Sequence, residues 1–200
     1  MKRYIQLSII TFLTGWINQS CNSNPNDLPE FVTFSEVTNS QMALDSFYTQ
    51  GIASVDINND LYPELYMTNS WKGFDNHFYN NLESTYTKDT VSFKLGDKYF
   101  SNGCAFADLN NDGFLDLCLA NANNKYNTVL FGNKNHRYSE HFIDTNATNW
   151  SYSTAIADVD NNGVVEVYIS NFNSKKNMFY RMNGNQFIEI DSTEITTDTS

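Results

Sequence analysis

Histidine, basic side chains and long apolar runs are all scarce in this sequence of 200 residues. The three histidines, His77, His136 and His141, do not have metal-ligand spacing, so we expect them to be surface or turn residues. Only 12 residues are basic against 23 acidic ones, and the formal net charge of −11 excludes a nucleic-acid partner because phosphates would be repelled. No serine has the setting of a nucleophile elbow, and no glycine-rich segment resembles a phosphate-binding loop. We therefore expect a protein without catalytic residues.

The composition nevertheless predicts a folded chain. Hydrophobic residues make up 40% of the sequence and aromatic residues 15%, which is enough for a sizeable core. The charged fraction of 18% is too low for a disordered polyanion. Cations are the natural partners of the acidic surplus, although a solvated acidic surface would explain that surplus equally simply.

The longest apolar stretch lies at the amino terminus and predicts an export signal over residues 1–21. Ile5–Ile17 has about the length of a secretory hydrophobic region and follows the basic Lys2 and Arg3. The stretch is too short for a comfortable membrane span.

Cys21 directly follows this stretch, in an arrangement that resembles a bacterial lipoprotein signal. In that family the cysteine becomes the lipidated first residue of the mature protein, but the preceding Asn18, Gln19 and Ser20 depart from the usual pattern. Lipidation at Cys21, ordinary cleavage nearby and a retained anchor therefore all stay open. Polar residues with two prolines follow and predict a flexible tether over 22–30.

Three segments of the remaining chain align without gaps, which indicates an internal repeat. They read GIASVDINNDLYPELYMTN from Gly51, GCAFADLNNDGFLDLCLAN from Gly103 and STAIADVDNNGVVEVYISN from Ser153. Their acidic loops begin at Asp56, Asp108 and Asp158, so the periods are 52 and 50 residues. This period is that of a supersecondary unit larger than one hairpin.

Each unit contains about four short strands separated by Asn, Gly and Asp turns, and no amphipathic helix is visible after the signal. The fourth strands are expected at VSFKL, HFIDT and FIEID, and FVTFSEV from Phe31 resembles one more copy of that strand. The sequence therefore predicts an all-β repeat array over 31–195, followed by a polar tail over 196–200.

The acidic loops have the oxygen ligands that a calcium ion prefers. Side chains at positions 1, 3, 5 and 9 of the loops, and the carbonyl group at position 7, are the candidate ligands. These are Asp56, Asn58, Asp60, Tyr62 and Glu64 in the first loop; Asp108, Asn110, Asp112, Phe114 and Asp116 in the second; and Asp158, Asp160, Asn162, Val164 and Glu166 in the third. Turns made by Asp, Asn and Gly without a metal are the simpler alternative.

An EF-hand shares the beginning of this loop but is excluded. It needs a bidentate glutamate at position 12 and a helix on each side, whereas position 12 is Met67, Leu119 or Ile169. The flanking segments are apolar runs of strand length, as expected for strands buried on both faces, so each loop should join the two strands of a hairpin.

The small residues before the loop, the D-x-N-x-D-G-x-x-D-L pattern and the following Asn-rich turn resemble the FG-GAP or VCBS repeat family. These repeats are the calcium-loop β-propeller blades best known from the head of integrin α subunits. The resemblance implies an all-β propeller, calcium at the loop positions named above and a role in binding or adhesion. The first loop departs most from the family pattern, with Leu61 in place of the glycine and with Pro63 at position 8.

Three loop-bearing units and one extra strand are too few for a seven-bladed ring, since propellers close with about four to eight blades. We expect part of a longer propeller, an open array, or copies that self-associate through open blade edges.

Cys104 and Cys118 flank the second loop and leave two alternatives. A hairpin centred on Asn111 would set them opposite each other for a disulfide; two buried free thiols are the plainer interpretation. The aromatic residues Trp71, Tyr126 and Phe172 follow the loops and either form a sugar- or protein-binding face or simply pack in turns.

Two functions follow from these expectations. The first is a non-catalytic, calcium-stabilised binding or adhesion module, exported to the cell surface, with a protein or glycan ligand and with membrane contact only through a lipid at Cys21. The second is the propeller portion of an exported carbohydrate- or lipid-acting enzyme whose catalytic part lies elsewhere.

Overall fold

The computed structural model describes most of the chain from residue 41 onward. The described residues are 41–44, 46–70, 76–83, 85–89, 100–123, 125–135, 137–144, 150–172 and 175–190. The predicted export signal, the tether, the strand expected from Phe31 and the polar tail lie outside them.

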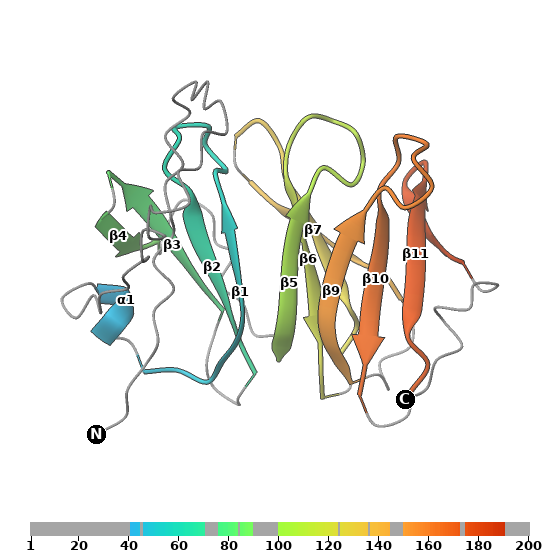
Figure 1. Ribbon diagram of the computed structural model, residues 1–200, viewed down its shortest axis with the longest axis horizontal. Coiled ribbons are helices and arrows are strands. Elements are labelled where there is room, and N and C mark those ends of the chain that lie inside the picture. Colours follow the sequence, from blue (N-terminus) through green and yellow to red (C-terminus); the bar gives the residue numbers. More distant parts are fainter. Residues whose placement is uncertain are drawn as a thin grey trace, which may run out of the picture.

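Within the described residues, twelve strands form three antiparallel sheets of four strands (Figure 1). Blade 1 consists of β1 (Thr49–Val55), β2 (Glu64–Asn69), β3 (His77–Leu82) and β4 (Thr85–Lys88); blade 2 of β5 (Ser101–Ala107), β6 (Asp116–Asn121), β7 (Thr128–Phe131) and β8 (Ser139–Phe142); and blade 3 of β9 (Ser151–Ala157), β10 (Glu166–Asn171), β11 (Met178–Asn183) and β12 (Gln186–Glu189). One short helix, α1 (Gln41–Leu44), precedes them. No helix in the described ranges has the length and apolar character to cross a membrane.

The strands of each sheet are paired in sequence order, so each repeat is one propeller-type blade. The blades lie side by side with their first strands β1, β5 and β9 adjacent (Figure 1). This arrangement confirms the predicted all-β, propeller-type repeat array, and the three blades do not close into a ring.

The second strand of each blade is its most buried element, as the apolar runs predicted. Every residue of β6 is buried, because blades 1 and 3 cover its two faces. Leu117 and Leu119 pack against blade 1 with Tyr66, whereas Cys118 packs against blade 3 with Val167. Alternate side chains of one strand therefore belong to two different interfaces.

Two glycines bring the first strands of neighbouring blades unusually close together. A Cβ atom on Gly51 would lie 2.6 Å from the carbonyl oxygen of Asn102, and one on Gly103 would lie 2.7 Å from the Cα atom of Ser153. Any larger residue would push the two backbones apart. These glycines therefore set the spacing of the inner strands.

Asparagines fasten the strand ends that lie opposite the acidic loops. In blade 2 the Oδ1 atom of Asn127 accepts a hydrogen bond from the N–H of Asn121 (2.8 Å), and the Oδ1 of Asn121 accepts one from the Ser101 hydroxyl (2.7 Å). In blade 3 the same two bonds are made by Asn171, Asn177 and Ser151. Asn102 also donates from Nδ2 to the Ser151 carbonyl (2.7 Å), which links blade 2 to blade 3.

The fourth strand of blade 1 differs from the prediction. It is Thr85–Lys88, whereas the predicted VSFKL segment at 91–95 lies outside the described residues. Leu82 pairs with Thr85, and Glu83 between them has a φ of +48°. A two-residue hairpin turn of this kind starts the next strand at once.

The two cysteines of blade 2 are free thiols. Cys104 pairs with Leu119, and Cys118 pairs with Ala105. The hairpin register is thus one residue away from the one that would set the cysteines opposite each other, so their side chains lie on opposite faces of the sheet.

His77 is buried, contrary to the expectation of a surface or turn residue. Its ring lies edge-on to Phe47 with centroids 4.1 Å apart, and its Nε2 atom lies 2.9 Å from Lys88 Nζ. The residue occupies a buried position of β3. The expectation was wrong because a polar side chain in a short strand gives no sign of burial in the sequence. His141 is exposed on β8, as expected, and His136 lies outside the described residues.

Candidate metal-binding loops

The three acidic loops connect the first and second strands of each blade. They follow β1, β5 and β9 and lie together at one end of the array, at the top of Figure 1. The predicted hairpin setting is therefore confirmed for all three loops.

Two left-handed backbone positions give the loops their tight curl. Position 4 is an asparagine in every copy, with φ values between +58° and +59° at Asn59, Asn111 and Asn161. Position 6 has a φ of +86° at Gly113 and Gly163, and of +72° at Leu61. Asparagine and glycine accept this conformation readily, whereas leucine does so at a cost.

The aspartate at position 1 organises each loop by accepting two backbone hydrogen bonds. In the second loop Asp108 accepts one from the N–H of Asp112 (3.0 Å) and one from the N–H of Gly113 (2.8 Å). Asp56 and Asp158 accept the equivalent pairs. The side chain at position 3 also accepts from the N–H of position 5 in all three loops.

The carboxylate at position 9 links the end of each loop to its beginning. Glu64, Asp116 and Glu166 are all buried, and each accepts a hydrogen bond from the N–H of position 2, at 3.0, 2.9 and 2.9 Å respectively. Asp116 also accepts a hydrogen bond from the N–H of Gly132 (2.9 Å). These buried carboxylates join the loop to the first residues of the second strand.

Burial raises the pKa of the position-9 carboxylates of the first two loops. It raises the pKa of Asp116 from 3.8 to about 6; the Asp112 and Asp108 carboxylates raise this pKa too, against the lowering by two backbone N–H groups. Burial likewise raises the pKa of Glu64. A cation among these oxygens would favour their ionised forms and offset their mutual repulsion.

The third loop fits a metal ion most directly. Carboxylate oxygens of Asp158, Asp160 and Glu166 all lie within 4.8 Å of one another. Two oxygens on opposite sides of one calcium ion are about 5 Å apart, since each bond is roughly 2.4 Å long. Within the described part of the chain this is the one group of three acidic, histidine or cysteine side chains with that spacing.

The first and second loops have an amide where the third has a carboxylate. Asn58 and Asn110 occupy position 3, and their Nδ2 atoms donate to the position-5 aspartates Asp60 (2.9 Å) and Asp112 (3.0 Å). Position 5 shows the reverse exchange, with Asn162 in the third loop, so each loop has three carboxylates. The donor set of the first two loops therefore also suits a hard cation.

Position 7, predicted to offer a carbonyl ligand, is fixed through its N–H group. The N–H groups of Tyr62, Phe114 and Val164 donate to the position-5 side chains at 2.8, 2.9 and 2.7 Å. All fifteen predicted site positions therefore lie within three closely similar loops.

A model of the FG-GAP-like repeat matches residues 56–119 and, in a second copy, residues 108–169. The two matches together span more than half of the chain. The chain belongs to the FG-GAP-like repeat family. No curated protein matches it significantly. FG-GAP-like repeats form β-propeller-type modules and are typical of exported or extracellular proteins.

Two features of these FG-GAP-like repeats escaped sequence reasoning. One is the set of strand-end asparagines described above. The other is an aromatic residue directly before the first strand of each blade, namely Tyr48, Phe100 and Trp150, whose carbonyl groups accept equivalent backbone hydrogen bonds. Extending the repeat alignment upstream would have revealed the aromatic residues, and extending it downstream would have revealed the asparagines.

Proposed function

We propose that this protein is a calcium-stabilised, non-catalytic binding module built from FG-GAP-like blades. The observation that carries the proposal is the gathering of Asp158, Asp160 and Glu166 in a loop geometry that two further loops repeat. Calcium accepts irregular shells of six to eight oxygens, which suits these mixed carboxylate, amide and carbonyl donors better than magnesium or zinc does.

The ion would act as a structural cross-link. With a dissociation constant of roughly 10⁻⁴ M, typical of extracellular modules, each site adds about 1.4 kcal/mol at about 1 mM calcium. Three such sites add about 4 kcal/mol, against a total stability of roughly 5–15 kcal/mol for an ordinary domain. Calcium binding would thus supply a large share of the free energy of unfolding.

A thermal melt tests this proposal directly. The chain is heated in excess chelator, in about 1 mM calcium and in about 1 mM magnesium. We expect calcium to raise the melting temperature by several degrees and magnesium to raise it less. Asp158→Asn should remove part of the calcium increment, whereas Glu140→Gln, which neutralises an exposed acid of β8 outside the loops, should leave it unchanged.

Equal melting temperatures in chelator and calcium would refute the metal proposal. The loops would then be turns held by their own side chains. A calcium increment that stays undiminished in the double variant Asp158→Asn with Asp160→Asn would mean that the third loop is not a site.

We propose further that the module acts at the cell surface by binding a protein or glycan. Family membership supports export, and the apolar stretch before Cys21 supports a signal. Metabolic labelling with a radioactive fatty acid tests the lipid anchor, since Cys21→Ser should abolish incorporation. Turnover of carbohydrate or lipid ester substrates by the purified chain would contradict the non-catalytic part.

Self-association through blade 3 is a further part of the proposal. Position 2 of the loop is apolar in every copy: Leu109 is 1% exposed where the next blade covers it, whereas the equivalent Val159 is 60% exposed. The outer face of blade 3 thus exposes an apolar residue at the position that is buried between the other blades. We propose that a second copy of the chain covers it. Sedimentation velocity should show a dimer that Val159→Asp dissociates; a monomer at every concentration would refute this.

A further inference from the structure

The end of the array opposite the acidic loops carries exposed aromatic side chains. It consists of the described parts of the segments before the first strands and of the connections between second and third strands, with the adjoining strand ends; we call it the aromatic end. Its exposed aromatic side chains are Tyr48, Tyr126, Phe142, Trp150, Tyr152 and Phe172. The aliphatic Leu44, in the segment before β1, is exposed there as well.

These rings form two neighbouring pairs on successive blades. The rings of Tyr126 and Phe142 in blade 2 have centroids 5.1 Å apart, and those of Tyr152 and Phe172 in blade 3 are 5.7 Å apart. Phe172 is 57% exposed and Tyr152 is 51% exposed although each contacts the other. Because each ring stays about half exposed despite its contact with the other, the pair lies at the surface and does not fill the core.

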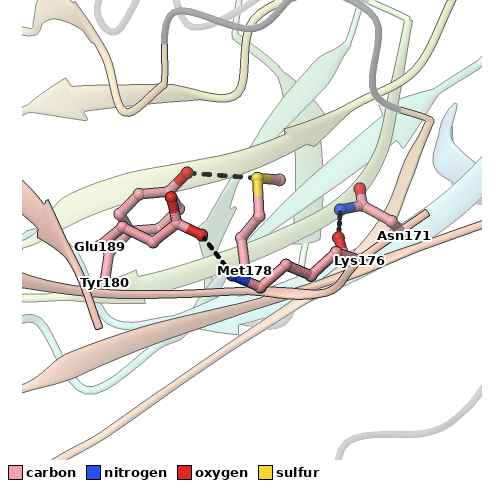
Figure 2. A network of polar contacts seen from close by, with 5 residues as sticks. All are labelled: Asn171, Lys176, Met178, Tyr180 and Glu189. Carbon is pink, nitrogen blue, oxygen red and sulfur yellow. Dashed lines mark hydrogen bonds and ion pairs between the residues drawn. The ribbon is translucent and has the colours of Figure 1, made fainter. Parts of the chain in front are cut away.

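Lysines accompany the rings, which is unusual for a chain with so few basic residues. Lys125 directly precedes Tyr126, and Lys175 and Lys176 lie in the connection that begins with Phe172. Lys176 is paired with Glu189 through a 3.3 Å contact, and its carbonyl accepts a hydrogen bond from Asn171 (Figure 2). Lys125 and Lys175 are exposed and form no ion pair with the described residues.

The three acidic loops concentrate negative charge at one end of the strands, although exposed Lys134 lies at that end too and Glu189 lies at the other. The aspartates of the three loops lie at one end, and the exposed lysines of the second-to-third strand connections lie at the other (Figure 1). An anionic partner is repelled from the loops and attracted to the aromatic end.

We propose that the aromatic end binds an acidic oligosaccharide that contains uronic acids, an inference that rests on the proposed role as a binding module. The C–H groups on the face of a pyranose ring carry partial positive charge and pack on the negative face of an aromatic ring. The lysine ammonium groups then pair with the sugar carboxylates. The two ring pairs supply one stacking surface on each of two successive blades.

The charge of the chain favours a ligand with few anionic groups. A densely sulfated chain would be repelled by the net charge of −11, whereas one carboxylate per disaccharide matches two available lysines.

Calorimetric titration of the full chain in millimolar calcium tests this proposal. The probes are a hyaluronan hexasaccharide, chitohexaose as a neutral chain of equal length, and a chondroitin sulfate hexasaccharide. We expect hyaluronan to bind more tightly than either, with an affinity that falls as salt rises from about 0.05 M to about 0.5 M. Tyr126→Ala and Phe172→Ala should each weaken binding by about three- to tenfold.

Matched variants separate stacking from charge. Lys125→Gln with Lys175→Gln should remove the preference for hyaluronan over chitohexaose, whereas Lys134→Gln and Leu82→Ala, which alter exposed residues of the acidic-loop end, should change nothing. The N–H of Phe172 donates to the Trp150 carbonyl and the Tyr126 carbonyl accepts from Asn121, so alanine at either position keeps these backbone hydrogen bonds. Unchanged calcium-dependent melting of each variant verifies folding.

Absence of binding to all three probes, or hyaluronan binding that both alanine variants leave intact, would overturn the proposal. Equal affinity for chitohexaose and hyaluronan would also overturn it, because the lysines would then have no role. The calcium melt does not involve this end, so a failed titration with a normal calcium response refutes the glycan site alone.

Discussion

Leu61 stores conformational strain in the first acidic loop, and Leu61→Gly should relieve it. Its φ of +72° lies in the left-handed region, where the equivalent Gly113 and Gly163 adopt +86°. The Leu61 side chain is 81% exposed, so its removal sacrifices little apolar burial. The N–H of Leu61 donates to Asp56 Oδ2 at 2.9 Å, and glycine retains this bond, as Gly113 does with Asp108.

The size of the gain follows from two opposing terms. A left-handed L-residue costs about 1–2 kcal/mol relative to glycine. Glycine also lowers the stability by about 0.4–1 kcal/mol, because it increases the conformational entropy of the unfolded chain. We expect a net gain of about 1 kcal/mol, which corresponds to a rise in melting temperature of roughly 2–4 °C for a chain of this size.

Thermal and urea unfolding of the wild type, Leu61→Gly and Leu61→Ala measure the effect in one buffer. Leu61→Ala removes the same exposed side chain but keeps the Cβ atom that makes the conformation costly, so it should change stability little. Equal stabilisation by glycine and alanine would show that the exposed side chain was responsible. A loss of stability in Leu61→Gly would refute the strain argument altogether.

Three other predictions concern the blade interfaces. Gly103→Ala should destabilise the fold by about 2 kcal/mol or more, because the added Cβ would meet the Ser153 backbone at 2.7 Å; Ser153→Ala is the control, and a neutral Gly103→Ala would disprove the close approach. Burial raises the pKa of Cys104 and of Cys118 from 9.0 to about 12, so both thiols should resist iodoacetamide in the folded chain and react in urea, and fast labelling of the native protein would contradict this. Because only the unfolded thiols release protons between pH 9 and about 12, the free energy of unfolding should fall as pH rises through that range, and cysteine-to-alanine variants should lose part of that dependence.

The acidic loops could be predicted from sequence because their chemistry is local. Each loop fits nine residues, and the conformations of its backbone follow from asparagine at position 4 and a glycine at position 6 in two of the copies. Three copies in register turned a weak turn pattern into a repeat. The buried second strands were also predictable, since an unbroken apolar run such as that of β6 needs cover on both faces.

Sequence reasoning left alternatives open, or was wrong, where the outcome depends on more than a short window of sequence. The register of the β5–β6 hairpin differs by one residue from the symmetric one, and that single step sends Cys104 and Cys118 to different interfaces. His77 is buried because Phe47, from the segment before β1, contacts its ring. Neither fact has a signature within a short window of sequence.

The repeat, the all-β class and the three acidic loops can be recognised in the sequence alone, because periodicity and residue spacing are properties of neighbouring residues. The tertiary structure alone decided which faces of the blades meet, how closely Gly51 and Gly103 let the inner strands approach, and which aromatic residues share one end. Tyr126 and Phe142 are sixteen residues apart, and Tyr152 and Phe172 are twenty. Their rings meet because antiparallel strands return the chain to the same end of the sheet, which only the fold brings about.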